Sequence, residues 1–176
     1  MSDIFVMEAA NLFCGDHDPT ASKHLTLSEL QLPALTEMFV DHHAGGSAVQ
    51  MEIPVGIEKM VASFKLIGWD PELMGQFGLS GRGSKRYTAY GVIRSRRTGN
   101  AMQAKVIMEG RLGKVEPEAF KRGEAQSHDY GINGIVHYEL HIAGAEKIYW
   151  DFFTAEWRVD GVQQNADEAR MLNLPV

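Results

Sequence analysis

The chain has 176 residues, 44% apolar and 23% charged, which matches ordinary globular usage and one domain, 1–176, with its own core. The net charge of −6 makes tight wrapping of DNA a poor hypothesis, and the single cysteine, Cys14, excludes an internal disulfide and a cysteine-rich zinc site. The N-terminus lacks the pattern of a signal peptide and no apolar run could cross a bilayer, so we expect a protein made in the cytosol without a membrane span.

The first distinctive feature along the chain is a long connection between two apolar segments, Leu35–Val40 and Val49–Ile53. Gly45-Gly46 can form a turn, so the flanking residues can pair as a long projecting hairpin. This hairpin has little apolar content and would pack poorly on its own core, so we predict that another chain covers it; the alternative is a mobile surface loop. The candidate contact residues are Asp41, His42, His43, Ala44, Gly45, Gly46 and Ser47.

A short strand and a helix come next. Apolar residues alternate from Met60 to Leu66, which indicates a strand. Asp70-Pro71-Glu72 then places a capping residue, a first-turn proline and an acid in order, and Gly78 would end the helix. Its predicted buried stripe consists of Leu73, Met74 and Phe77.

The segment from Gly78 to Lys85 is rich in glycine and resembles a phosphate-binding loop. Such a loop needs lysine and then serine or threonine directly after its last glycine, and it joins a strand to a helix. Here the order is Ser84-Lys85, and the segment follows a helix and enters a strand. We therefore predict that it binds no nucleotide.

Strict apolar-polar alternation marks two later segments, from Ala101 to Leu112 and from Ile132 to Ile142, and Lys85 to Ser95 is β-rich with weaker alternation. This pattern is typical of half-buried antiparallel strands. Turn signals follow or separate these strands, and we interpret Asn133-Gly134 as lying near a strand start. The other turns are Arg97-Thr98-Gly99-Asn100, Ala143-Gly144 and Asp160-Gly161.

The histidines raise the question of a metal site. His137, Glu139 and His141 share one strand face, but positions i and i+4 of a strand lie roughly 13 Å apart, too far for one ion. His42 and His43 are adjacent and would point to opposite faces of a strand. We interpret these side chains as solvated or interface polar groups, and we expect no metal, no cofactor and, without a nucleophile elbow, no enzyme.

The last element is a helix in which Asn165 can act as the cap, with Glu168 at capping-box spacing and an end near Leu172. Strands outnumber helices over the whole chain. We therefore predict a mainly β (α+β) fold: an antiparallel β-barrel or sandwich with one or two flanking short helices and the long projecting hairpin.

Charge is unevenly distributed, since residues 1–60 sum to −7, residues 61–125 to +6 and residues 126–176 to −5. Segments of opposite sign can pair in an assembly, or they can be ordinary solvated charge. Arg94, Arg96 and Arg97 cluster at one predicted hairpin end. Without interleaved aromatic residues they are weak evidence for nucleic-acid binding, and a contact with acidic segments of a neighbouring subunit explains them at least as well.

Several short stretches occur in a fixed order between about Asn11 and Leu174: Asn11-Leu12-Phe13, Leu32-Pro33-Ala34-Leu35-Thr36, Gly68-Trp69-Asp70-Pro71, Arg96-Arg97-Thr98-Gly99, the strand that ends in Gly110-Arg111, Tyr138-Glu139-Leu140 and Asp160-Gly161-Val162. Together they resemble the major tail tube family of contractile-tailed bacteriophages and the related R-type pyocins.

The resemblance implies a β-barrel subunit that forms hexameric rings, stacked as the inner tail tube, with the hairpin reaching the adjacent ring. It implies a structural protein of the virion whose partners are itself, the tail sheath, the baseplate and the tail terminator. DNA would pass through the lumen without specific binding, past a wall that we expect to be net acidic. The alternatives are a tube subunit of a tail-like bacteriocin or secretion-type injection device, and a small β-barrel that binds a ligand.

Overall fold

The computed structural model describes residues 3–15, 21–78 and 83–174, and within these ranges the chain is mostly strand. The elements, in chain order, are β1 Phe5–Cys14, β2 Leu27–Gln31, β3 Glu37–His42, β4 Met51–Ile57, β5 Ala62–Ile67, α1 Pro71–Met74, β6 Lys85–Ser95, β7 Ala101–Pro117, β8 Ser127–Ile142, β9 Ala145–Asp151, β10 Glu156–Val159, β11 Val162–Gln163 and α2 Ala166–Met171.

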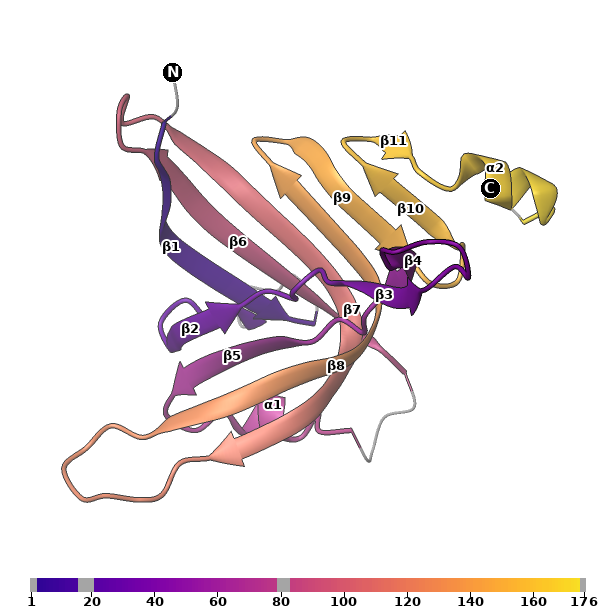
Figure 1. Ribbon diagram of the computed structural model, residues 1–176. Coiled ribbons are helices and arrows are strands. Elements are labelled where there is room, and N and C mark those ends of the chain that lie inside the picture. Colours follow the sequence, from indigo (N-terminus) through magenta and orange to yellow (C-terminus); the bar gives the residue numbers. More distant parts are fainter. Residues whose placement is uncertain (1–2, 16–20, 79–82, 175–176) are drawn as a thin grey trace.

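The main sheet folds over itself into a two-layer sandwich, because β7 and β8 are long enough to run through both layers (Figure 1). One layer has the order β1-β6-β7-β8-β9-β10-β11, and the other is built by β2 and β5 on the N-terminal half of β8. The described strands of this sheet pair in antiparallel fashion. The predicted sandwich is confirmed, whereas the barrel alternative is wrong, since the sheet does not close on itself.

The bend in β8 lies at the Asn133-Gly134 turn signal. The β7–β8 register passes from Glu109↔His137 to Arg111↔Asn133, so β8 carries extra residues there and Gly134 adopts a φ of 58°. The prediction that Asn133-Gly134 lies near a strand start is therefore wrong. A turn dipeptide inside a strand serves here as a bulge that redirects the strand into the second layer.

The core lies between the two layers and follows the predicted alternation. In β7, Ala104, Val106, Met108 and Leu112 are buried on one face. On the neighbouring strands β5 and β8, the rings of Phe64 and Tyr130 stack with centroids 5.2 Å apart. The other large buried side chains are Leu12, Leu66, Leu73, Tyr87, Ile132 and Tyr138.

Two-residue turns join the outer strands as predicted. Ala143 and Gly144 have φ angles of 52° and 81°, and Asp160 and Gly161 have 49° and 76°. Positive φ at both central residues is the type I′ geometry that matches the twist of a hairpin. The β6–β7 turn at residues 97–100 is likewise confirmed.

Both helices form, with corrections. Asp70 caps α1 by accepting the backbone N–H of Leu73 at 3.0 Å, but the helix ends at Gly75 rather than Gly78, and Phe77 is exposed. The chain leaves the helix early because Gly78 donates its backbone N–H to the Leu112 carbonyl in β7. At α2 the side chain of Asn165 donates to the Ala155 carbonyl instead of capping the helix, so no capping box forms.

Candidate functional site

The predicted hairpin exists as a two-stranded sheet of its own, formed by β3 and β4. Its register runs from Glu37↔Ile57 to His42↔Met51, and Gly45 and Gly46 form the turn. Within the loop, a ring nitrogen of His43 lies 3.0 Å from the Ser47 carbonyl oxygen. In Figure 1 the hairpin lies away from β1, and its base approaches β9 and β10.

The hairpin arms are more apolar than the sequence analysis expected. Little apolar surface is present at the tip, but the two strands expose six large apolar side chains, each 39% to 60% accessible: Met38, Phe39, Val40, Met51, Ile53 and Val55. The expectation of low apolar content rested on the glycine-rich connection alone. The exposed apolar side chains lie in the two segments that flank this connection. A surface of this kind is typical of a contact with another chain.

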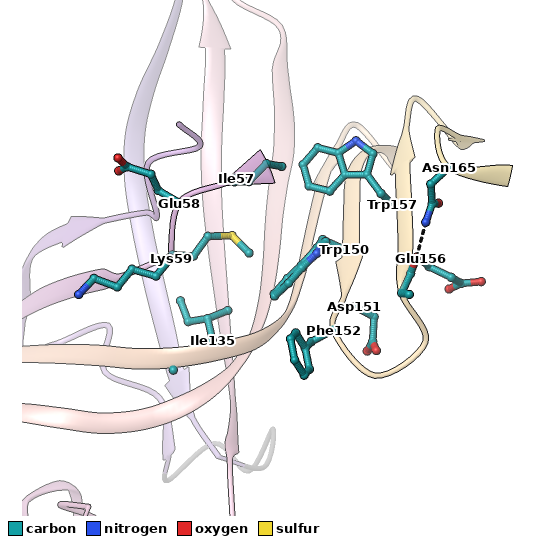
Figure 2. Close-up of a pocket in the computed structure, with 13 residues that line it drawn as sticks. Ile57, Glu58, Lys59, Ile135, Trp150, Asp151, Phe152, Glu156, Trp157 and Asn165 are labelled. Atoms are coloured by element: carbon teal, nitrogen blue, oxygen red, sulfur yellow. Dashed lines mark hydrogen bonds between the residues drawn. The ribbon is translucent and has the colours of Figure 1, made fainter. Parts of the chain in front are cut away.

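An aromatic cavity of about 710 Å³ lies between the base of the hairpin and strands β9 and β10. Figure 2 shows Trp150, Trp157 and Phe152 on one side of it and Ile57 and Ile135 on the other. Polar groups stand at its margin, where Asp151, Glu156 and Asn165 line it. The sequence does not predict this cavity, because the residues that line it come from distant parts of the chain.

The predicted arginine cluster lies at the β6–β7 turn, and two of its members are already paired within the chain. Arg94 donates to Glu8 at 2.7 Å and to the Gly99 carbonyl at 2.8 Å, and Arg96 lies 3.3 Å from the same glutamate. The hydrogen bond from Arg94 holds the pKa of Glu8 below its ordinary value. Only Arg97, among the three, forms no ion pair with a described residue of its own chain.

Next to this turn, the N-terminal end of β1 is an exposed sheet edge. β1 pairs with β6 on one side, while its other side bonds Ser22 and Lys23 through Asn11, Leu12 and Phe13 near its C-terminal end. Three apolar side chains at this end are half or more exposed: Ile4 (69%), Phe5 (54%) and Met7 (50%).

The three polar residues predicted to share a face of β8 do so, and they form a network. The two ring nitrogens of His137 lie 2.9 Å from Asp151 and 2.8 Å from Glu139, and Glu139 also reaches His141 at 2.9 Å. The contact between His137 and Asp151 therefore ties β8 to β9.

The same face continues onto β10. Arg158 pairs with both oxygens of Glu146 at 3.0 Å, meets Glu156 at 3.1 Å and lies 3.5 Å from the centre of the Tyr149 ring. The hydrogen bond from Arg158 lowers the pKa of Glu146. This side of β8, β9 and β10 is thus a fixed layer of paired charges.

Among the described residues no group of three or more His, Cys, Asp or Glu side chains is placed to hold a metal ion, and none of their helices is long and apolar enough to cross a membrane. Cys14 is buried, and burial raises the pKa of its thiol to about 12. Half of the glycine-rich segment considered for nucleotide binding, residues 79–82, lies outside the described residues, although Lys85 does begin β6 as expected.

These features define a β-rich subunit with surfaces suited to contact with other chains. The model of the family described as phage tail tube protein FII matches residues 10–172. The chain therefore belongs to the phage tail tube family, and its role is structural, as a component of the tail.

Solved structures support the fold. The chain is similar, with a TM-score of 0.54 and 8% identity over 76% of this chain and 88% of the other, to a protein in the sheath–tube complex of PVC, an extracellular contractile injection system, in its extended state. It is also similar, with a TM-score of 0.52 and 7% identity over 76% and 92%, to one in the PVC sheath/tube terminator structure. The comparison with curated proteins gave no match.

Proposed function

We propose that six copies of this chain form a ring, and that the rings stack into the inner tube of a contractile tail through which DNA enters the host. Membership of the tail tube family is the observation that carries this proposal. The open sandwich supports it, because an unclosed sheet leaves strand edges that neighbouring subunits can cover. When two different surfaces of a subunit meet, the rotation from one subunit to the next decides the assembly. A rotation that returns to the first subunit gives a closed ring, and one that does not gives an open, growing filament.

The β3–β4 hairpin, with tip residues Asp41, His42, His43, Ala44, Gly45, Gly46 and Ser47, is the proposed contact between rings. Its six exposed apolar side chains support the assignment, since they find cover only on another chain. The sheath, baseplate and terminator are the proposed partners at the outer face and the ends of the tube. The subunit would be made in the host cytoplasm before it enters the virion.

The polar face of β7 to β10 is the proposed channel wall. The carboxylates of this face are Glu109, Glu139, Glu146, Asp151 and Glu156, and its basic side chains include Lys105 and Arg158. An excess of carboxylates repels phosphates and lets DNA slide. Arg158 is held by Glu146 and Glu156, so its guanidinium is less available to bind phosphates.

Two alternatives remain. A tube subunit of a tail-like bacteriocin or an injection device would share this architecture, and a sheath and baseplate gene beside a capsid gene would decide for a phage. A ligand-binding module is favoured only by the aromatic cavity of about 710 Å³.

Negative-stain micrographs and sedimentation of the purified protein over a range of concentrations test the proposal. Sixfold rings or stacked tubes are expected. A protein that stays a compact monomer at high concentration, also in the presence of preformed tail ends as seeds, would contradict it and favour the binding module.

A further inference from the structure

We propose that β3 of one subunit adds as an extra strand to the free edge of β1 in a second copy of this chain. The inference rests on the proposed self-assembly and names the two surfaces that meet. Both partners are strands whose outer backbone groups lack a described strand beside them, since β3 pairs only with β4, and Phe5–Met7, the part of β1 before its bulge at Glu8, pairs only with β6. Exposed strand edges are templates for pairing with another chain.

The choice of β3 over β4 follows from the backbone donors. Pro54 lies within β4 and has no N–H group, and Gly56 has a φ of 143°, next to a break in the hairpin register. A proline of this kind interrupts a ladder and is confined to edge strands that stay unpaired. β3, from Glu37 to His42, contains no proline and presents a regular edge.

Charge selects the partner surface. The hairpin arms and tip carry Glu37, Asp41 and Glu52, and no lysine or arginine lies between Lys23 and Lys59. At the end of β1, Glu8 pairs with Arg94 and Arg96, and Asp3 accepts the backbone N–H of Arg97. The guanidinium of Arg97 has no ion pair with a described residue of its own chain, so the acidic hairpin would meet this cation, which favours this partner surface.

Apolar contacts complete the match. Met38, Phe39 and Val40 are exposed on β3, and Ile4, Phe5 and Met7 are exposed at the receiving end. The two surfaces lie on different sides of the molecule, β1 at one edge of the sheet and the hairpin away from it, so one subunit does not satisfy itself (Figure 1). A second copy of this chain supplies both the complementary charge and the complementary apolar side chains.

Chemical cross-linking tests the contact directly. Met7→Cys and Val40→Cys are combined in one chain, the protein is assembled, and a short bismaleimide is added. The native Cys14 is buried, so its thiol should not react with the bismaleimide. The expected result is a ladder of cross-linked oligomers on a denaturing gel, with none from either single variant.

The control pair combines Val40→Cys with Phe120→Cys. Phe120 is 79% exposed and is followed by Lys121 and Arg122, so the β7–β8 loop is the other basic and apolar surface that could receive the hairpin. Cross-linking of this pair in place of the first would overturn the inference. Tubes that form without the Met7–Val40 cross-link would also overturn it while leaving the proposed function intact, whereas the absence of any oligomer would contradict both.

A backbone variant separates strand addition from side-chain packing. The Ile4 carbonyl accepts from Arg96 on the β6 side, so the N–H of the next residue, Phe5, points to the free edge. Phe5→Pro removes this donor, and Phe5→Ala removes the ring but keeps the donor. We expect Phe5→Pro to raise the concentration needed for assembly about tenfold over Phe5→Ala, as loss of one hydrogen bond per contact implies. Equal assembly of the two folded variants would contradict strand addition.

Discussion

The carboxylate of Asp151 accepts a hydrogen bond from Nδ1 of His137 at 2.9 Å, across the β8–β9 pair. Burial alone would raise the pKa of Asp151, but the backbone N–H groups of Thr154 and Phe153 and the bond from His137 outweigh it, so the pKa lies below its ordinary value. For Glu139, burial likewise raises the pKa, and the bonds from His141 and His137 bring it below the ordinary value. Both carboxylates therefore favour the folded state when they are ionised.

A histidine substitution should reveal this contribution through its pH dependence. A carboxylate with a lowered folded-state pKa contributes stability above its unfolded pKa, and this contribution is lost as the pH falls through the folded pKa. We expect His137→Gln to lower the free energy of unfolding by about 1–3 kcal/mol near pH 6 and by clearly less near pH 3. Urea titrations at the two pH values measure the difference. The exposed His42→Gln serves as the control, and an equal loss at both pH values would contradict the prediction.

The bend of the main sheet depends on Gly110. A Cβ atom at this position would lie 2.9 Å from Cγ2 of Ile132 and 3.1 Å from the backbone oxygen of Asn133, and a backbone atom cannot rotate away. We expect Gly110→Ala to destabilise the fold by about 1–3 kcal/mol, as overpacking in a core does. Gly46→Ala is the matched control, because a Cβ at Gly46 meets nothing within 4 Å. Thermal unfolding of both variants gives the comparison, and indistinguishable midpoints would refute the role of Gly110.

Removal of residues 44–48 should separate folding from stacking. The hairpin forms a sheet apart from the main one, so its tip contributes nothing to the core. We expect the shortened chain to unfold at the same denaturant concentration as the complete one and to form no long tubes. Circular dichroism and electron microscopy measure the two properties. Long tubes from the shortened chain would show that the tip is not a contact between rings.

The three arginines at the β6–β7 turn should behave differently from one another. Arg94 holds Glu8 and the Gly99 carbonyl, so Arg94→Glu should weaken the pairing of β1 with β6 and lower the unfolding midpoint. Arg97→Glu should leave the midpoint unchanged and weaken assembly, with an effect that shrinks as salt screens the contact. Sedimentation at low and high ionic strength, beside thermal unfolding, tests both. An Arg97→Glu protein that assembles normally at low salt would contradict the assignment.

Local signals predicted the strands well because their side chains report which face is buried. The alternation over 101–112 and the turns at Ala143-Gly144 and Asp160-Gly161 appear in the structure where they were expected. The cap at Asp70 was also found, because it depends on contacts a few residues away.

Features that depend on distant residues could not be read in this way. The early end of α1 follows from the bond between Gly78 and Leu112, and the missing cap at Asn165 follows from the carbonyl of Ala155. The pairing of Glu8 with Arg94 joins positions 86 residues apart, which charge counts along the chain do not indicate. The aromatic cavity and the open sandwich have the same origin, since both depend on how the long strands bend.

The separate two-stranded sheet of β3 and β4 has a consequence for how fast tubes form. Two strands without a third are marginally stable in water, so in a free subunit the hairpin should open and close, and its amide hydrogens should exchange quickly. Ordering it costs conformational entropy, and two free subunits gain only one contact in return. A subunit that reaches a finished ring meets several ordered neighbours at once. Elongation of an existing tube should therefore be faster than nucleation of a new one. We expect a lag phase in assembly that the addition of short preformed tubes abolishes.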